Sequence, residues 1–444
     1  MTAYGDITRT FTLRERLRRI RESDGVDRLL EAGELAQALA DVECAGHAGA
    51  VTAAAWPPHS KLTSKVPEGY AYYAVYPELY ERAAKRAGPK TRRRVVIGIR
   101  TIGTSLGRVV ADAVDADEFF TVRPIGHPFH REVKLDRELD PEAGYFVVDE
   151  GPGLSGSSFA AVAAVIPSEH LYFLPSHGNG PGPQADDAVR AAWARARVLV
   201  EEFAFDPRWI EPLVGRVETV EDLGGGAWRK IVGDAPAWIG KERRKVLVNG
   251  RYLAKFAGLG AYGREKLDKA KHLEGLIPRV VGLANGFLVS NWIEGTFASD
   301  RAALLDAIRR YLGVVATLRA PSWRSSAPIA PPSIDVELVD VDNRMHPWEW
   351  IATASGDIVK CDALDHSAAH DGIGVQDLAW DVAGAMVEHG FSAEELGFAF
   401  DAKLAFFINA YAAKQSAIFH QAAAESPAEE AVKLEERARF YDSQ

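Results

Sequence analysis

The sequence lacks the features that mark secreted, zinc-stabilised or membrane-spanning proteins. Its 444 residues contain only two cysteines, Cys44 and Cys361, whose spacing fits neither a disulfide framework nor a zinc site. No run of about 18 apolar residues occurs, and the N-terminal residues hold no apolar stretch of the signal-peptide type. We therefore expect a cytoplasmic protein with reduced cysteines and no membrane partner.

The sequence also lacks an excess of positive charge. With 52 Lys and Arg against 62 Asp and Glu, its formal net charge is -10, which argues against nucleic acid as a partner. The hydrophobic content of 47% is that of a globular protein. A chain of this length exceeds one ordinary core, so we expect two domains. Residues 1 to about 50 carry Leu and Ile at helical spacing and are predicted to form helices.

The most informative stretch is Tyr145–Ser158, YFVVDEGPGLSGSS. An apolar strand ends in two acids, Asp149 and Glu150, and a Gly/Ser turn then opens a helix of small residues. Free N–H groups at a helix start, together with hydroxyls, make an anion site, while the acids suit sugar hydroxyls or a Mg²⁺ ion. The anion-site candidates are Ser155, Gly156, Ser157 and Ser158. The alternative is an ordinary strand-to-helix turn of an α/β sheet.

A second strand, turn and helix precede this stretch. Val95–Ile99 is predicted to be a buried strand, and a helix follows from about Leu106. Because the carboxyl ends of parallel strands meet at one edge of a sheet, this turn and the first are expected to lie close together. Its candidate anion ligands are Arg100, Thr101, Gly103, Thr104 and Ser105.

These two sites together resemble type I phosphoribosyltransferases. The resemblance implies phosphoribosyl pyrophosphate as substrate and Mg²⁺ as cofactor, with Asp149 and Glu150 at the ribose hydroxyls and the metal. It places the 5-phosphate on the loop 155–158 and the pyrophosphate on the loop 100–105. Two departures from the family pattern are a connection, 151–154, about one residue longer than usual and serine in place of threonine.

A basic, turn-rich segment lies between the two sites. In the resembled family a mobile loop in this region closes over pyrophosphate, which implies catalytic roles for Arg123, His127 and Arg131, with His130 and Lys134 as further candidates. A surface β-hairpin is the alternative. Ser176, His177 and Asn179 follow the next strand and are expected near the acceptor or the sugar.

The Gly-rich segment Leu223–Gly226 marks a change of pattern, and we place the domains at 1–220 and 221–444. Asn249-Gly250 predicts a hairpin. The alternation of its second strand puts Lys255 on the same face as Leu253. This half resembles the small lobe and hinge of protein-kinase-like phosphotransferases, particularly the aminoglycoside phosphotransferase group. The resemblance implies that Lys255 meets the α- and β-phosphates of ATP and that Glu265 is its helix partner.

The later part of this half matches the same group only partly. His346–Ile351 resembles the end of the catalytic loop, with Glu349 at the position of a metal-binding asparagine, and Asp362 matches the metal-binding aspartate. Arg344 stands where the catalytic aspartate is expected, which leaves Asp342 as the candidate base. Two further features follow. The stretch HDGIGVQDLAWDVAGA resembles the buried-aspartate helix of the group through Asp377, and a polar cluster of Asp365, His366 and His370 suits metal, substrate or a satisfied acidic hairpin.

The expected fold is therefore a parallel α/β sheet with flanking helices, followed by an α+β bilobal domain. The leading hypothesis is a phosphoribosyltransferase that uses phosphoribosyl pyrophosphate and Mg²⁺ to modify a small-molecule acceptor, fused to an ATP-dependent kinase-like domain. One alternative is a sugar-phosphate or nucleotide sensor with a degenerate kinase domain. Another is a small-molecule kinase with a non-catalytic first domain. Small molecules are the expected partners, with homodimer formation as an option.

Overall fold

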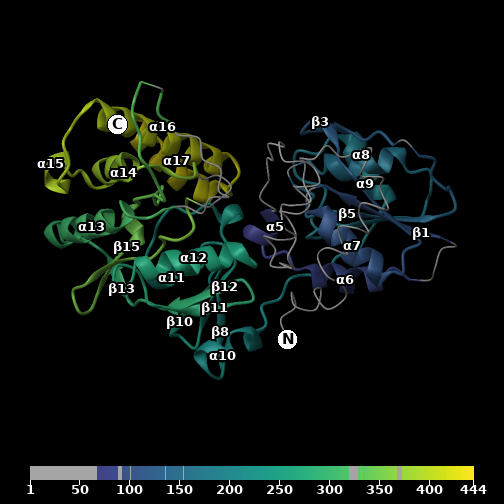
Figure 1. Cartoon of the computed structure of the whole chain (residues 1–444), viewed down its shortest axis with the longest axis horizontal. Coiled ribbons are helices and arrows are strands. Elements are labelled where there is room, and N and C mark those ends of the chain that lie inside the picture. Colours follow the sequence, from purple (N-terminus) through teal and green to yellow (C-terminus); the bar gives the residue numbers. More distant parts are fainter. Residues whose placement is uncertain are drawn as a thin grey trace, which may run out of the picture. The chain divides into compact units, whose positions relative to one another are not determined.

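The computed structural model describes residues 68–88, 93–100, 102–135, 137–153, 155–319, 329–331, 333–367 and 373–444. The chain divides into two compact units (Figure 1). The first extends to Asp206 and includes Gly258–Tyr262, and the second comprises Pro207–Ala257 and Gly263–Gln444. The helices predicted within residues 1–50, as well as Thr101 and His370, lie outside the described residues.

A five-stranded parallel sheet forms the centre of the first unit, in the order β2-β1-β5-β6-β7. The central strands β1, β5 and β6 are nearly continuous apolar runs because both faces of a parallel sheet are covered. The parallel sheet predicted for this half is confirmed. The strands are β1 (Arg94–Ile99), β2 (Glu118–Val122), β5 (Gly144–Val148), β6 (Leu171–Leu174) and β7 (Arg197–Val198).

Helices pack on both faces of this sheet. On one face, Val95 and Ile97 share a core with Phe159 of α8 and Trp193 of α9. On the other face α7 approaches so closely that a Cβ on Gly98 would lie 2.2 Å from the Gly103 carbonyl oxygen. The helices are α5 (Glu68–Ala71), α6 (Pro77–Lys85), α7 (Gly103–Ala113), α8 (Ser157–Val165) and α9 (Asp187–Arg195), and the segment between β2 and β5 forms the hairpin β3 (Ile125–His127) and β4 (His130–Glu132).

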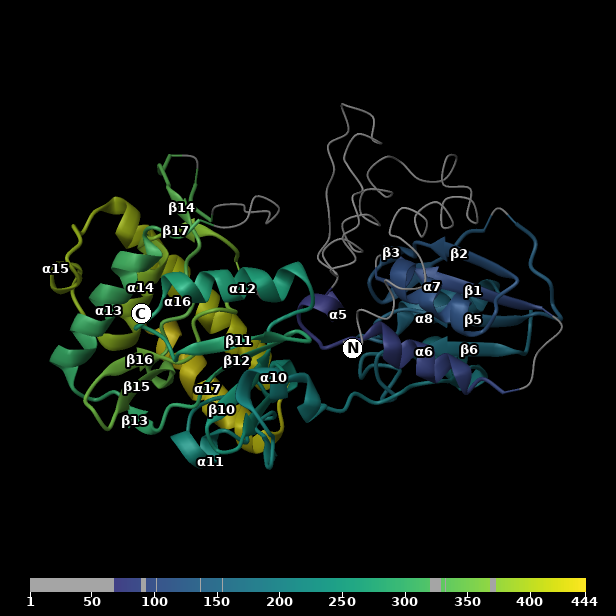
Figure 2. The same cartoon turned by 60° about the horizontal axis from the view of Figure 1, so that its bottom comes forward.

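A five-stranded antiparallel sheet begins the second unit, in the order β11-β12-β10-β9-β8, and helix α12 (Ala261–His272) runs beside it (Figure 2). Asn249 and Gly250 have φ values of 51° and 62° in the turn between β9 and β10, so the predicted hairpin is confirmed. The predicted domain boundary at 220 falls inside β8, which pairs with β9 and therefore belongs to this unit. The strands are β8 (Val220–Asp222), β9 (Lys245–Val248), β10 (Tyr252–Phe256), β11 (Val280–Ala284) and β12 (Phe287–Asn291).

The rest of this unit is mainly helical around a core that includes Tyr311, Trp350, Trp380 and Tyr411. Among the described residues, no helix combines the length and apolarity needed to cross a membrane. Its helices are α10 (Glu211–Val214), α11 (Arg229–Val232), α13 (Arg301–Val315), α14 (Ala379–His389), α15 (Ala393–Leu396), α16 (Ala402–Ala424) and α17 (Ala428–Asp442). Short strands complete it: β13 (Gly295–Phe297), β15 (Trp350–Thr353), β16 (Ile358–Lys360), β14 (Leu338–Val339) and β17 (Gln376–Asp377).

Candidate functional site

A cleft in the second unit has an apolar wall and a charged end. Its empty volume, including the open mouth, is about 490 Å³. Strands β10, β11 and β12 supply the apolar wall through Leu253, Val280 and Leu288. The charged end consists of Lys255, Lys266, Lys360, Asp362 and Asp365. An apolar slot that leads to fixed charges suits a ligand with a flat ring at one end and phosphates at the other.

Lys255 of β10 is the cation at the centre of this charged end. Its Nζ lies 2.7 Å from Asp362 Oδ1 and 2.8 Å from Asp365 Oδ2. Burial by itself would lower the pKa of Lys255, but these two carboxylates raise it above its usual range. Leu253 and Lys255 both line the cleft, which confirms the prediction that they share a face of the strand. Lys255 is thus a fully charged ammonium held at the cleft.

Helix α12 does not present the residue that the resemblance implied. The carboxylate partners of Lys255 are Asp362 and Asp365, and Glu265 is not among the residues that line the cleft. The next residue, Lys266, lines it instead. Neighbouring residues of a helix point in directions about 100° apart. The cleft is therefore lined by the cation Lys266 and not by the anion Glu265. Burial lowers the pKa of Lys266 to about 7.

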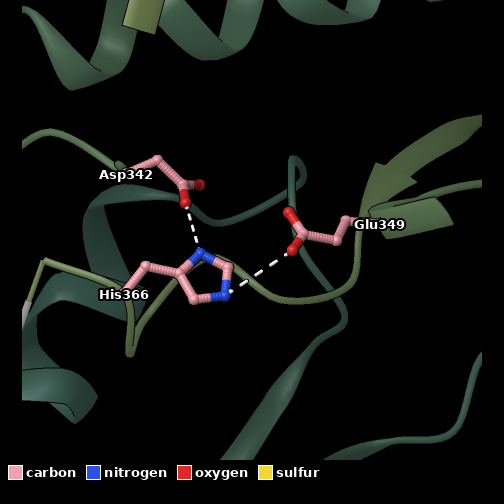
Figure 3. Close-up of side chains that lie close together, drawn as sticks. All are labelled: Asp342, Glu349 and His366. Atoms are coloured by element: carbon pink, nitrogen blue, oxygen red, sulfur yellow. Dashed lines mark hydrogen bonds and ion pairs between the residues drawn. The ribbon is translucent and has the colours of Figure 1, made fainter. Parts of the chain in front are cut away.

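Asp342, Glu349 and His366 converge in a buried cluster behind the cleft (Figure 3). His366 Nδ1 lies 2.7 Å from Asp342 Oδ1, and His366 Nε2 lies 3.6 Å from Glu349 Oε1. Lys360 of β16 lies 2.9 Å from Asp342 and 2.7 Å from Glu349. Burial opposes charge on His366, yet the carboxylates of Glu349 and Asp362 raise its pKa to about 9. The cluster therefore contains its own compensating cations.

A metal ion fits this cluster poorly, although the three side chains offer donor atoms within 4.8 Å of one another. The Lys360 ammonium already contacts both carboxylates, so a metal ion would have to displace it. The metal role of Glu349 stays a prediction: Glu349 belongs to this group of possible ligands, and its carboxylate pairs with Lys360. Asp362 pairs in a similar way with Lys255, but its side chain is 38% exposed and lines the cleft, so it is the more accessible metal-ligand candidate.

Asp342 is placed as a structural residue and not as a base. It is 1% exposed, does not line the cleft, and accepts bonds on both oxygens. His366 contacts Oδ1, while the Tyr311 hydroxyl donates to Oδ2 at 2.5 Å. A general base must reach the proton that it removes. The predicted catalytic role of Asp342 therefore has no support in its position.

A residue that the sequence prediction missed holds the segment around Asp342. Asp381 of α14 is fully buried and accepts from the backbone N–H groups of Asp342 at 2.7 Å and Asn343 at 3.0 Å. The predicted Asp377 lies in β17 before this helix and accepts from Glu337 N. Both aspartates occur in the stretch QDLAWD, four residues apart. Asp377 is buried as well, at 5% exposed, so only the packing of α14 shows which of the two holds the Asp342 segment.

The two acids of the first unit lie directly after β5. Burial raises the pKa of Asp149 to about 7, against the effect of the hydrogen bond that its Oδ1 accepts from Glu150 N. Glu150 Oε2 accepts from the Gly69 N–H. Ser176, which follows the neighbouring strand β6, donates to the Gly151 carbonyl oxygen through its N–H at 3.1 Å. The turns expected to lie together are those after β1 and β5, and a Cβ on Gly103 would lie 2.5 Å from the Val148 carbonyl oxygen at the end of β5.

The Gly/Ser loop is packed against the β3–β4 hairpin. Ser157 Oγ donates to the Pro128 carbonyl oxygen at 2.6 Å, and Ser155 Oγ lies 3.3 Å from the same oxygen. Both serines are buried, whereas Ser158 is half-buried. Gly156 has φ of 74°, and a Cβ there would lie 2.7 Å from Trp193 Nε1. A phosphate would have to replace the bonds of Ser155 and Ser157 to Pro128.

The remaining predicted residues of this unit lie in two groups. Arg100 donates from Nε to Thr121 Oγ1 at 2.8 Å, while Ser105 Oγ lies 2.7 Å from the Tyr70 hydroxyl. Gly103, Thr104 and Ser105 are buried at the start of α7. The basic segment forms the hairpin given above as the alternative, with His127 exposed and Arg123 and Arg131 half-buried. Arg131 donates to the Pro124 carbonyl oxygen at 3.2 Å.

Comparison with known proteins gives a partial likeness. No family model and no curated protein matches the sequence. The solved structure of choline kinase LicA from Streptococcus pneumoniae is similar over 53% of this chain and 96% of its own, at 17% identity and a TM-score of 0.34. Aminoglycoside phosphotransferase APH(2'')-Ib, ADP-bound, is similar over 53% and 99%, at 13% identity and a TM-score of 0.31.

A third similar structure is the streptomycin-ATP-APH(2")-IIa ternary complex, which matches 48% of this chain and 90% of its own at 12% identity and a TM-score of 0.30. Each of these three structures matches about half of this chain. At these identities and TM-scores, a substrate and an activity for this chain must be argued from its own site. The phosphoribosyltransferase-like character of the first unit stays a prediction.

Proposed function

We propose that the second unit binds ATP in the cleft and acts as a phosphotransferase on a small hydroxylated molecule. The observation that carries this proposal is the charged end of the cleft, where Lys255 and Asp362 face one another at 2.7 Å next to an apolar wall. An ammonium group there suits the phosphates of a nucleotide, and an adjacent carboxylate suits the Mg²⁺ that accompanies them. When bound, Mg²⁺ would be held by Asp362 and would neutralise phosphate charge.

The position of Asp342 does not exclude phosphoryl transfer. The reaction depends mainly on positioning and on electrostatic stabilisation of the phosphates, so a protein can support it without a strong base. The residues of the cleft bind and orient the nucleotide. Lys255 holds the phosphates, and the apolar wall holds the nucleobase. If ATP binds but no acceptor is phosphorylated, the unit is the nucleotide sensor given above as an alternative.

Lys255→Ala is expected to weaken ATP binding by at least about tenfold, since it removes a charge-assisted bond to phosphate. Titration calorimetry with ATP and Mg²⁺ on the full chain measures this change. Lys271→Ala is the matched control, because Lys271 is also a lysine of this unit but its side chain is 67% exposed. ATP affinity that is equal in wild type and Lys255→Ala would refute the proposed site. ADP release with a panel of small hydroxylated acceptors then separates a kinase from a sensor.

A second candidate function is phosphoribosyl transfer by the first unit. It is supported by the parallel pairing of β1 with β5 and of β5 with β6, which brings the turns after these strands to one edge of the sheet. At this edge Asp149 and Glu150 would face the ribose and Mg²⁺, and the loops 100–105 and 155–158 would bind pyrophosphate and phosphate. The loop 155–158 binds a phosphate only after the Ser155 and Ser157 hydroxyls leave the Pro128 carbonyl oxygen.

Asp149→Asn combined with Glu150→Gln is expected to reduce pyrophosphate release from phosphoribosyl pyrophosphate at least about a hundredfold, because the variant loses both charges at the reacting centre. Release is followed with Mg²⁺ and a panel of small acceptors. Glu142→Gln, an exposed acid before the same strand, should keep full activity. Full activity in the double variant would show that the acids do not form the site.

A further inference from the structure

Helix α12 directs a positive charge into the cleft. The Lys266 side chain is 3% exposed, lines the cleft, and donates to the Ala257 carbonyl oxygen. Its Nζ lies 3.0 Å from Asp365 Oδ1. The resemblance implied an acid, Glu265, at this place. The helix thus adds a lysine to the cleft, beside Lys255 and Lys360, instead of a carboxylate partner for Lys255.

One carboxylate holds both ammonium groups. Asp365 Oδ2 lies 2.8 Å from Lys255 Nζ, and the other oxygen of the same carboxylate contacts Lys266. Asp365 is 6% exposed, so these charges interact in a poorly solvated environment. Two buried cations side by side are stabilised by an anion that binds both, and in this structure Asp365 is that anion. An anionic ligand with two oxygens can take its place between the two lysines.

We propose that Lys266 is a second phosphate-binding residue, which together with Lys255 selects a nucleoside di- or triphosphate over a monophosphate. This inference rests on the proposed nucleotide-binding function. The phosphates take over contacts that Asp365 makes in the structure, and the base lies against Leu253, Val280 and Leu288. Each ammonium–phosphate bond is charge-assisted. A ligand with a single phosphate engages one lysine fewer and binds more weakly.

The test compares ADP with AMP by titration calorimetry on the full chain, with and without Mg²⁺. Wild type is expected to bind ADP at least about tenfold more tightly than AMP, and Lys266→Gln should lose most of that preference while AMP affinity changes little. Lys266→Arg should retain it. Lys269→Gln is the matched control, because Lys269 lies on the same helix and is also buried, but pairs with Asp340 outside the cleft.

Three outcomes would overturn the inference. The first is Lys266→Gln with unchanged ADP affinity, and the second is a Glu265→Gln variant that loses the ADP preference instead. The third is equal affinity of wild type for AMP and ADP, a result that requires no variant to fold. In all three cases the proposed ATP site still stands if wild type binds ATP. A wild-type protein that binds no nucleotide would overturn the inference together with the proposed function.

Discussion

Lys360→Met is expected to destabilise the second unit by about 3–5 kcal/mol, because the change leaves buried carboxylates without their cation. Lys360 is 0% exposed and contacts both Asp342 and Glu349. Methionine keeps most of the apolar part of the lysine side chain, so the decrease in the free energy of unfolding reports mainly the loss of the ammonium charge. Calorimetric or urea unfolding of the full chain gives the value, provided that the transition of this unit is resolved. The exposed Lys271→Met should leave stability unchanged.

Neutral side chains at positions 342 and 349 are expected to restore the stability of Lys360→Met. Adding Asp342→Asn and Glu349→Gln to Lys360→Met removes the uncompensated charges, and most of the stability should return. Added Mn²⁺ should stabilise Lys360→Met more than wild type, because Asp342, Glu349 and His366 offer donor atoms within 4.8 Å of one another and the variant lacks the competing ammonium. If the single variant were as stable as wild type, Lys360 would not be the cation of this cluster.

Asp381→Ala should also destabilise the second unit strongly, by about 3–5 kcal/mol. The variant leaves the buried N–H groups of Asp342 and Asn343 without an acceptor. Unfolding of the full chain measures the change. Asp306→Ala, on the exposed face of α13, is the control. A small loss would mean that the segment around Asp342 is held by its other contacts.

The destabilisation caused by Asp381→Ala is expected to depend on pH. Burial raises the pKa of Asp381 to about 7 from a value of 3.8. Between about pH 4 and pH 7 the folded protein therefore keeps a proton on Asp381 that the unfolded chain has released. The contribution of Asp381 to the stability of the folded protein thus decreases as the pH rises through this range. Because the alanine variant lacks this component, the difference from wild type should be larger at pH 5 than at pH 8.

Local sequence was sufficient to predict the parallel sheet and the hairpin that carries Lys255, but not strand β8 of the antiparallel sheet. The apolar runs at Val95–Ile99 and Tyr145–Val148 form β1 and β5, and Asn249-Gly250 forms the turn before the strand with Lys255. Alternation along that strand also placed Lys255 on the correct face. These features depend on neighbours in the chain, because period-two alternation and the φ preferences of Asn and Gly act within a few residues.

The sequence by itself therefore determined the two-part α/β and α+β organisation, the strand that carries Lys255 and the acids after β5. Only the tertiary structure decided which charges meet. Lys255 pairs with Asp362 across 107 residues, α12 presents Lys266 in place of Glu265, and Lys360 is the cation of the Asp342 cluster. The physical reason is that a helix rotates its side chains by about 100° per residue, so packing against distant segments selects the face that enters the site.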